Sequence, residues 1–159
     1  MKKFFKRIIK KFVKSRTIIP YFWYFSAKSQ SDNLENNLIA ELSKKININK
    51  SFIEFGFGPF EYNCINLTKN NYSGLLIDGD KESCKLANDI FRGLNLKTYA
   101  KSYWLKADSL APIEDFIKNN QNKLGLLSVD IDGNDYWILK EIYGMVKPEI
   151  IVTEYNASF

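Results

Sequence analysis

Histidine is absent from this chain of 159 residues, and cysteine occurs only twice, at Cys64 and Cys84. A chain without histidine cannot form a Ser-His-Asp triad and has no histidine to act as a general base. The two cysteines also lack the close spacing of zinc ligands, which excludes a zinc site. We interpret both thiols as small buried apolar groups in a reducing compartment, and this favours a cytoplasmic location.

Long apolar runs are missing as well. No segment reaches the roughly 20 apolar residues that a membrane-spanning helix needs. Apolar residues nevertheless make up 45% of the chain and charged residues 26%, as in ordinary folded domains. We therefore expect a basic N-terminal segment at residues 1–30 and one folded domain at residues 31–159.

Acidic residues do not occur in the first 16 positions, although these positions hold eight of the 23 lysines and arginines. The other 15 basic residues are outnumbered by the 18 acidic residues, so the remaining chain is mildly acidic despite the net charge of +5. This distribution argues against nucleic-acid binding by the folded domain.

Apolar residues recur at helical spacing in the basic segment, at Phe5, Ile8, Ile9, Phe12 and Val13. The pattern predicts a basic amphipathic helix, which either lies on an anionic membrane surface or docks on its own domain. The aromatic-rich stretch 18–25 that follows suits an interface or packing on the domain. A cleaved signal peptide is disfavoured, because lysines interrupt the early apolar residues and Pro20 splits the short apolar region.

Helix-like and strand-like segments alternate from residue 31 onward. Apolar strands are expected at residues 51–56, 74–79, 96–104, 124–131 and 149–155. Helices are expected from near Asp32 to Ile46 and at residues 59–70, 80–93, 108–120 and 134–143. Strand–helix alternation with apolar strands predicts an α/β, Rossmann-like three-layer sandwich, whose mostly parallel sheet has the order 3-2-1-4-5.

Particular residues are expected to fix these helices. The first helix is predicted to bury one face, formed by Leu34, Leu38, Leu42 and Ile46. Gly93 is expected to stop the helix that begins after Asp80, and Asp108 or Ser109 to cap the next helix. In the helix from about Asn134, the inward residues are expected to be Trp137, Leu139 and Ile142.

Glycines and acids follow the predicted strands at the carboxyl edge, where ligands bind in this fold class. The first strand carries Glu54, and the turn after it holds Gly56 and Gly58, which would let a ligand touch the backbone. The other polar residues at strand ends are Asp78, Asp80, Asp130, Asp132, Glu154 and Asn156. For Asp80, Asp108 and Asn134 we favour a helix-capping role over a ligand role. For Asp78 and Asp130 we favour the ligand role.

The charge of this edge favours a cationic cofactor. A dinucleotide site wants a third glycine where this chain has Glu61, and no Gly-Lys-Ser/Thr phosphate loop exists. S-adenosylmethionine has no phosphate, and its sulfonium and ammonium groups suit acidic surroundings. A dinucleotide-dependent oxidoreductase is a disfavoured alternative.

Two segments carry a resemblance to a known family. Glu54-Phe-Gly56-Phe-Gly58 resembles the first motif of class I S-adenosylmethionine-dependent methyltransferases, and Asp78 matches the acid that holds the ribose hydroxyls there. Residues 127–137 and 152–156 are similar to methyltransferase-like bacterial proteins near the FkbM family. The departure from the family pattern is the bulky pair Pro59 and Phe60 in the first loop.

The resemblance implies methyl transfer to a hydroxyl or amine of a small metabolite, sugar or glycan. The residues expected at the cofactor are Glu54, Gly56, Gly58, Asp78, Asp80 and Asp108. Asp130, with Asp132 as second choice, would accept or orient the acceptor's proton. A magnesium ion on Asp130, Glu154 and Asn156 is an alternative that we do not favour.

The family has two further strands beyond the fifth. Without them, residues 150–153 would form an apolar edge strand with unpaired backbone groups. We therefore expect either that the chain is a fragment or that a partner or second copy covers this edge. A non-catalytic Rossmann-like module tethered at a membrane surface is the remaining alternative.

Overall fold

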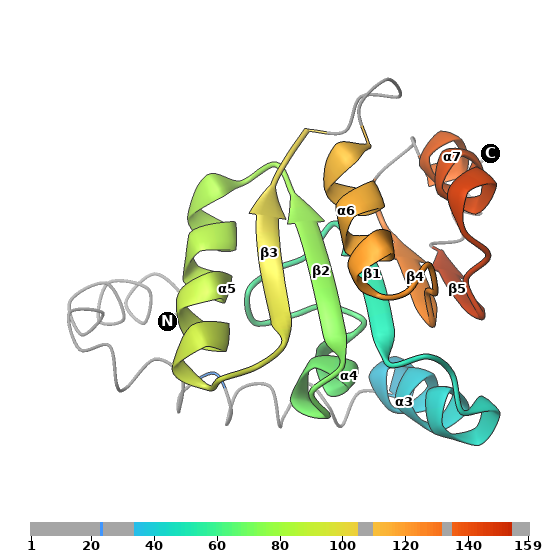
Figure 1. Ribbon diagram of the computed structural model, residues 1–159. Coiled ribbons are helices and arrows are strands. Elements are labelled where there is room, and N and C mark those ends of the chain that lie inside the picture. Colours follow the sequence, from blue (N-terminus) through green and yellow to red (C-terminus); the bar gives the residue numbers. More distant parts are fainter. Residues whose placement is uncertain (1–22, 24–33, 105–109, 132–134, 154–159) are drawn as a thin grey trace, which may run out of the picture.

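The computed structural model describes residue 23 and residues 34–104, 110–131 and 135–153 (Figure 1). Helices and strands alternate along the described chain. The elements are α3 (Leu34–Ile46), β1 (Ser51–Phe55), α4 (Ile65–Lys69), β2 (Ser73–Asp78), α5 (Lys81–Gly93), β3 (Thr98–Ser102), α6 (Ala111–Asn119), β4 (Leu126–Val129), α7 (Asp135–Met145) and β5 (Ile150–Thr153).

The five strands form one sheet in the order β3-β2-β1-β4-β5, and every neighbouring pair is parallel. In the centre of the sheet, Ile53 of β1 lies level with Leu75 of β2 and Leu127 of β4. The predicted α/β, Rossmann-like fold and its strand order are therefore confirmed.

Two apolar layers cover the sheet because successive strand residues point to opposite faces. On one face, residues such as Phe52, Leu76 and Leu126 pack with buried side chains from α3, α4 and α5. On the other face, Ile53 and Val129 pack with α6 and α7. The carboxyl ends of all five strands consequently meet at one edge of the sheet, where ligand sites of this fold class form.

Trp23 belongs to the first of these layers although it lies in the N-terminal segment, outside the predicted domain. Its side chain is fully buried, and its ring meets that of Phe91 in α5 edge to face at 5.9 Å between centroids. Its indole Nε1 donates a hydrogen bond of 2.9 Å to the carbonyl oxygen of Pro59. At this residue, the aromatic stretch 18–25 packs on the domain.

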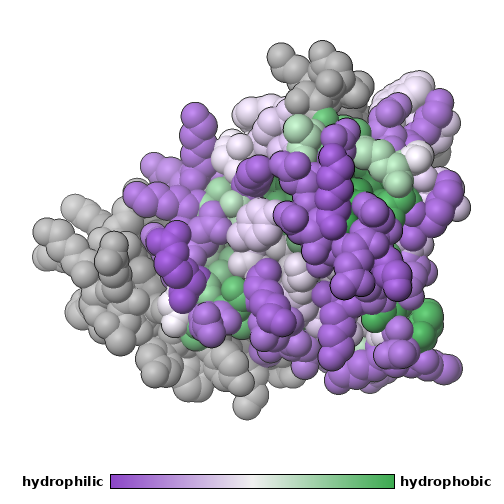
Figure 2. Space-filling view, viewed as in Figure 1, coloured by the Kyte–Doolittle hydropathy of each residue, from purple (hydrophilic) through white to green (hydrophobic). Residues whose placement is uncertain are grey.

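The buried face of α3 differs from the one predicted. Ile39, Ala40 and Ser43 are buried, whereas Leu38 is 58% exposed and Ile46 is 52% exposed. Apolar side chains are visible at the lower right of Figure 2, where Figure 1 places α3. The buried serine is tolerated because its hydroxyl donates a 2.7 Å hydrogen bond to the carbonyl oxygen of Ile39.

Helix ends agree with the prediction in part. Helix α5 ends at Gly93, as predicted, but the left-handed conformation that follows is adopted by Asn95, at φ 54°. Asparagine tolerates this conformation better than other residues with a Cβ. The N-cap of α6 is Leu110 instead of the predicted Asp108 or Ser109, both of which lie outside the described residues. In α7, Ile142 is buried as expected, but Trp137 is 60% exposed.

Strand β5 lies at the edge of the sheet, and within the described residues it pairs only with β4. The side chain of Ile151 on this strand is 40% exposed. The expectation that a partner or second copy covers this edge stays a prediction. Within the described ranges, no helix is long and apolar enough to cross a membrane.

Candidate functional site

The ends of β1 and β4 approach each other at the carboxyl edge of the sheet. Gly56 adopts a left-handed backbone, with φ 72°, and its amide donates a 3.1 Å hydrogen bond to the carbonyl oxygen of Ile77. A Cβ atom on Gly56 would collide with the carbonyl oxygen of Asp130. The missing side chain at Gly56 thus makes room for the Asp130 backbone, and contact of this glycine with a ligand stays a prediction.

Gly58 serves a tight turn in the loop between β1 and α4. Its amide donates to the carbonyl oxygen of Glu61 at 3.0 Å, and the Glu61 amide donates back at 3.1 Å. This paired turn, with Pro59 inside it, takes the place of the first turns of the helix predicted at residues 59–70. Helix α4 therefore begins only at Ile65.

The side chain of Glu54 fixes the position of the loop between β1 and α4. Its carboxylate is fully buried and accepts hydrogen bonds from the backbone amides of Asn63 at 2.7 Å and Cys64 at 2.8 Å. Burial raises the pKa of Glu54 from 4.5 to about 7; these bonds oppose the rise, and Asp130 nearby adds a smaller one. Both oxygens of Glu54 are thus occupied at the N-terminus of α4, so direct cofactor contact by this carboxylate stays a prediction.

Asp78 ends β2 beside the Gly56 turn. Its Oδ1 accepts a 2.7 Å hydrogen bond from the amide of Asp80, and the side chain remains partly exposed. Its Oδ2 accepts no hydrogen bond from the described part of the chain. Asp78 therefore offers one carboxylate oxygen to a ligand at the carboxyl edge.

Asp80 is the N-cap residue of α5. It accepts hydrogen bonds from the Glu82 amide at 2.9 Å and from the Ser83 hydroxyl at 2.6 Å. These two bonds, with that of Ser83 contributing most, lower the pKa of the carboxyl group. The capping role is therefore observed for Asp80, and its additional role at a cofactor stays a prediction.

Trp104 is a residue of this edge that the sequence did not single out. The backbone reaches it from β3 through Tyr103, whose amide donates a 2.9 Å hydrogen bond to the carbonyl oxygen of Asp78. Its indole lies against Gly79, where a Cβ atom would sit 2.5 Å from the ring, yet the side chain is 80% exposed. An aromatic surface thus stands beside Asp78, and only the absent side chain at position 79 lets it lie there.

Asp130 follows β4 with an exposed side chain, and its amide donates a 3.3 Å hydrogen bond to the carbonyl oxygen of Phe55. The structure therefore brings Gly56, Asp78 and Asp130 to one edge, as predicted from the strand ends. Asp108 and Asp132 lie outside the described residues, as do the metal-ligand candidates Glu154 and Asn156. Within the described ranges, no group of three acidic or cysteine side chains is arranged to hold a metal ion.

The two thiols are shielded from reaction. Burial raises the pKa of Cys64 well above its usual value, with a further rise from the charge of Glu54. Burial also raises the pKa of Cys84 to about 11. Both cysteines are free thiols that stay protonated at neutral pH, which excludes them as thiolate nucleophiles.

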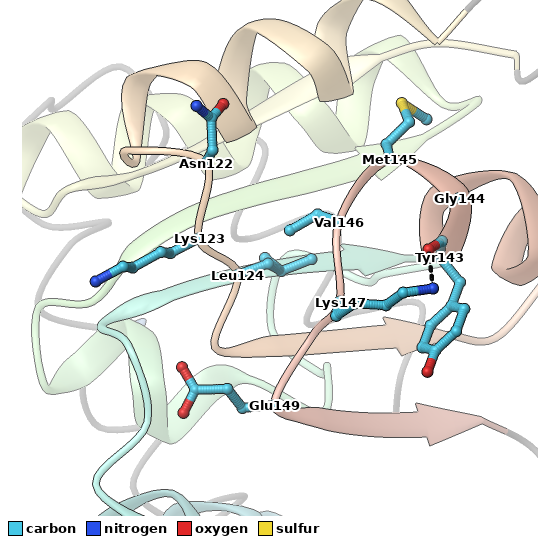
Figure 3. Close-up of a pocket in the computed structure, with 9 residues that line it drawn as sticks. All are labelled: Asn122, Lys123, Leu124, Tyr143, Gly144, Met145, Val146, Lys147 and Glu149. Atoms are coloured by element: carbon cyan, nitrogen blue, oxygen red, sulfur yellow. Dashed lines mark hydrogen bonds between the residues drawn. The ribbon is translucent and has the colours of Figure 1, made fainter.

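An open groove of about 500 Å³ lies at the opposite, amino end of β4 and β5 (Figure 3). Lys147 and Tyr143 interact within it: the Lys147 Nζ donates a 2.9 Å hydrogen bond to the Tyr143 carbonyl oxygen and lies 3.4 Å from the centroid of its ring. Since ligands of parallel α/β sheets bind at carboxyl ends, we place the candidate site at the edge formed by Gly56, Asp78, Trp104 and Asp130.

The fold and the position of this edge define an α/β protein with a Rossmann-like sheet. Comparison of the chain with family models, with curated proteins and with solved structures gives no significant match.

Proposed function

We propose that this protein binds S-adenosylmethionine at the carboxyl edge of its sheet and transfers the methyl group to a hydroxyl, or less favourably an amine, of a small metabolite, sugar or glycan. The observation that carries the proposal is the placement of Asp78 beside the Gly56 turn. The Gly56 amide donates a hydrogen bond to the carbonyl oxygen of Ile77, which directly precedes Asp78. The Asp78 Oδ2, which accepts no hydrogen bond from the described residues, therefore lies next to the glycine turn. A carboxylate there suits a ribose diol.

Glu54 supports this cofactor over a dinucleotide. A pyrophosphate in this fold class binds the free amides at the N-terminus of the helix after β1. Here the amides of Asn63 and Cys64 already bind the Glu54 carboxylate, and α4 has only five residues. A phosphate placed there would compete with the Glu54 carboxyl group for these two amides, whereas a ligand without phosphate does not need this position.

The protein's own part in the reaction would be positioning and proton transfer. S-adenosylmethionine supplies an electrophilic methyl group when bound. Asp78 would hold the ribose, and the Gly56 turn would set the depth of the site. Asp130, or Asp132 as second choice, would orient the acceptor hydroxyl in line with the methyl group and accept its proton. Glu54 would act indirectly, as the residue that fixes the loop around the site.

The proposal places the enzyme in the cytoplasm, with residues 1–16 as a contact to the inner face of the membrane. It does not require magnesium, although Asp130 with Glu154 and Asn156 would offer the hard oxygen ligands that magnesium prefers.

Isothermal titration with S-adenosylhomocysteine, the demethylated product, tests the proposal. Asp78→Ala should weaken binding by about tenfold to a hundredfold, because charge-assisted hydrogen bonds contribute about 1.5–3 kcal/mol. Glu41→Ala removes an exposed acid on α3 and should leave the affinity unchanged. No binding by the folded protein would favour a non-catalytic module, and tight NADH binding alone would favour an oxidoreductase.

A further inference from the structure

An open groove of about 660 Å³ runs between α5 and the edge strand β3, and its end at Lys81 and Ser102 reaches the carboxyl edge of the sheet. Its charged lining is mainly basic. Four cationic side chains and one acidic side chain line it, namely Lys81, Lys85, Arg92, Lys101 and Asp89. In Figure 2, hydrophilic side chains predominate over the region where Figure 1 places α5 and β3.

The cations of α5 form one stripe. Lys81, Lys85 and Arg92 are spaced four and seven residues apart, so their directions around the helix axis agree within about 40°. Along the axis they cover about 16 Å. The stripe is therefore long and straight, and it suits an extended anionic surface better than a single small anion.

The acid in the groove neutralises little of this charge. Asp89 lies 3.8 Å from Arg92, and the two side chains are 53% and 78% exposed, so solvent screens the pair. Lys85 and Lys101 make no ion pair with any residue in the described ranges. A positive surface therefore remains available to a ligand.

The backbone of β3 is not free to pair with another strand along this groove. The side-chain amide of Asn88 donates to the carbonyl oxygen of Ala100 at 2.8 Å and accepts from its amide at 2.8 Å. This pairing closes the edge strand at its centre. Recognition at this face consequently depends on the cations instead of backbone pairing.

The basic N-terminal segment precedes Trp23, which packs on α5. Trp23 is anchored against Phe91, one residue before Arg92. Six residues separate Arg16 from Trp23, so their Cα atoms lie at most about 25 Å apart. The eight cations of residues 1–16 precede this anchor in the sequence, and the apolar residues interspersed among them favour a bilayer over a nucleic acid.

We propose that the face formed by α5 and β3 is a membrane-binding surface that docks on anionic phospholipid headgroups and orients the domain on the bilayer. Residues 1–16 supply apolar anchorage, and the groove cations contact the headgroups. The proposal does not rest on the methyltransferase proposal, because it is argued from the cations of the groove and not from the cofactor residues.

Vesicle sedimentation of the full chain tests it. Vesicles of phosphatidylcholine are compared with vesicles that also contain phosphatidylglycerol. Lys85→Glu with Lys101→Glu should weaken partition onto the anionic vesicles by about thirtyfold, which corresponds to about 1 kcal/mol for each lysine. The matched control, Lys44→Glu with Lys45→Glu, makes the same change of net charge on exposed residues of α3 and should bind nearly as well as the unaltered protein.

Other outcomes overturn the proposal. Equal loss of vesicle binding in both double variants would show a general effect of net charge. No loss of binding in either variant would show that the face formed by α5 and β3 does not bind membranes. If Lys85→Glu with Lys101→Glu weakens binding to a labelled single-stranded RNA but not to vesicles, the partner is a nucleic acid. Thermal melts verify that both variants are folded, and Lys85→Gln with Lys101→Gln provides a milder pair. S-adenosylhomocysteine titration of the same variants keeps this result separate from the proposed enzymatic activity.

Discussion

Gly56 and Asp130 are in contact through their backbones, because the turn after β1 is pressed against the carbonyl group that follows β4. The contact depends on the missing side chain at Gly56 and on its φ of 72°. It holds the ends of two central strands together and so determines how wide the carboxyl edge of the sheet opens.

Gly56→Ala should therefore destabilise the fold by at least about 2 kcal/mol. Part of this cost is the left-handed backbone, and part is the displacement needed to relieve the collision with Asp130. Urea unfolding measures it. Gly144→Ala is a suitable control, since a Cβ atom at Gly144 in α7 would meet no atom of the described residues within 4 Å beyond its chain neighbours and the nearby backbone of its own helix. This control should stabilise the helix by about 0.5–1 kcal/mol, and equal effects of both substitutions would contradict the assignment.

The buried carboxyl group of Glu54 should make stability depend on pH. Its pKa is raised from 4.5 to about 7 in the folded protein, so the folded state binds the proton more tightly than the unfolded state. The stability from this group is then fully present below pH 4.5 and is lost as the pH rises through 7. The loss amounts to about 3 kcal/mol.

Comparison with Glu54→Gln isolates this effect, because glutamine does not titrate and the other carboxyl groups are unchanged. The free energy of unfolding is measured in urea at several values between pH 4.5 and 8. The unaltered protein should lose more stability over this range than the variant. At low pH the variant should be the less stable of the two, because its NH₂ group faces one of the amides of Asn63 and Cys64. Parallel pH profiles would show that Glu54 does not titrate here.

The sequence predicts the sheet well because its strands are apolar, short and separated by recognisable helices. It predicts the buried face of α3 poorly, since two stripes of that helix have helical spacing. The stripe that is buried includes Asn36 and Ser43. The Ser43 hydroxyl donates to the Ile39 carbonyl oxygen, and the Asn36 carbonyl oxygen accepts a bond from Asn66, which no periodicity reveals. Sequence pattern alone favours the leucines, and only tertiary contacts decide between the two faces.

Prediction of the candidate site from the sequence is limited in the same way. Its acids and glycines could be located at strand ends from the sequence, since parallel strands bring their carboxyl ends together. The hydrogen bonds that the Asn63 and Cys64 amides donate to Glu54 depend on the conformation of the intervening loop. The short length of helix α4 depends on it as well. Trp104 was missed because an aromatic residue after a weak strand has no signature until Gly79 is seen beneath it.

Asn88 should stabilise the edge of the sheet at β3. Asn88→Ala removes both hydrogen bonds to the backbone of Ala100 and should cost about 1–3 kcal/mol. The uncovered edge should also increase self-association at high protein concentration, which light scattering detects. Asn119→Ala, at an exposed position in α6, provides the control and should change neither quantity measurably. A variant at Asn88 that is as stable as the control would show that water replaces the amide without cost.

Trp104 should contribute to cofactor affinity if the proposed function is correct. Its exposed indole lies beside Asp78, where the nucleoside would be held, and stacking of a base on an aromatic ring contributes about 1–3 kcal/mol. Trp104→Ala should therefore weaken S-adenosylhomocysteine binding about tenfold in calorimetric titration, and Trp104→Phe should recover much of the loss. Trp137→Ala removes another exposed tryptophan, on α7, and should leave the affinity unchanged. If both alanine variants bind as tightly as the unaltered protein while Asp78→Ala does not, the base lies elsewhere along the carboxyl edge and Trp104 only covers Gly79.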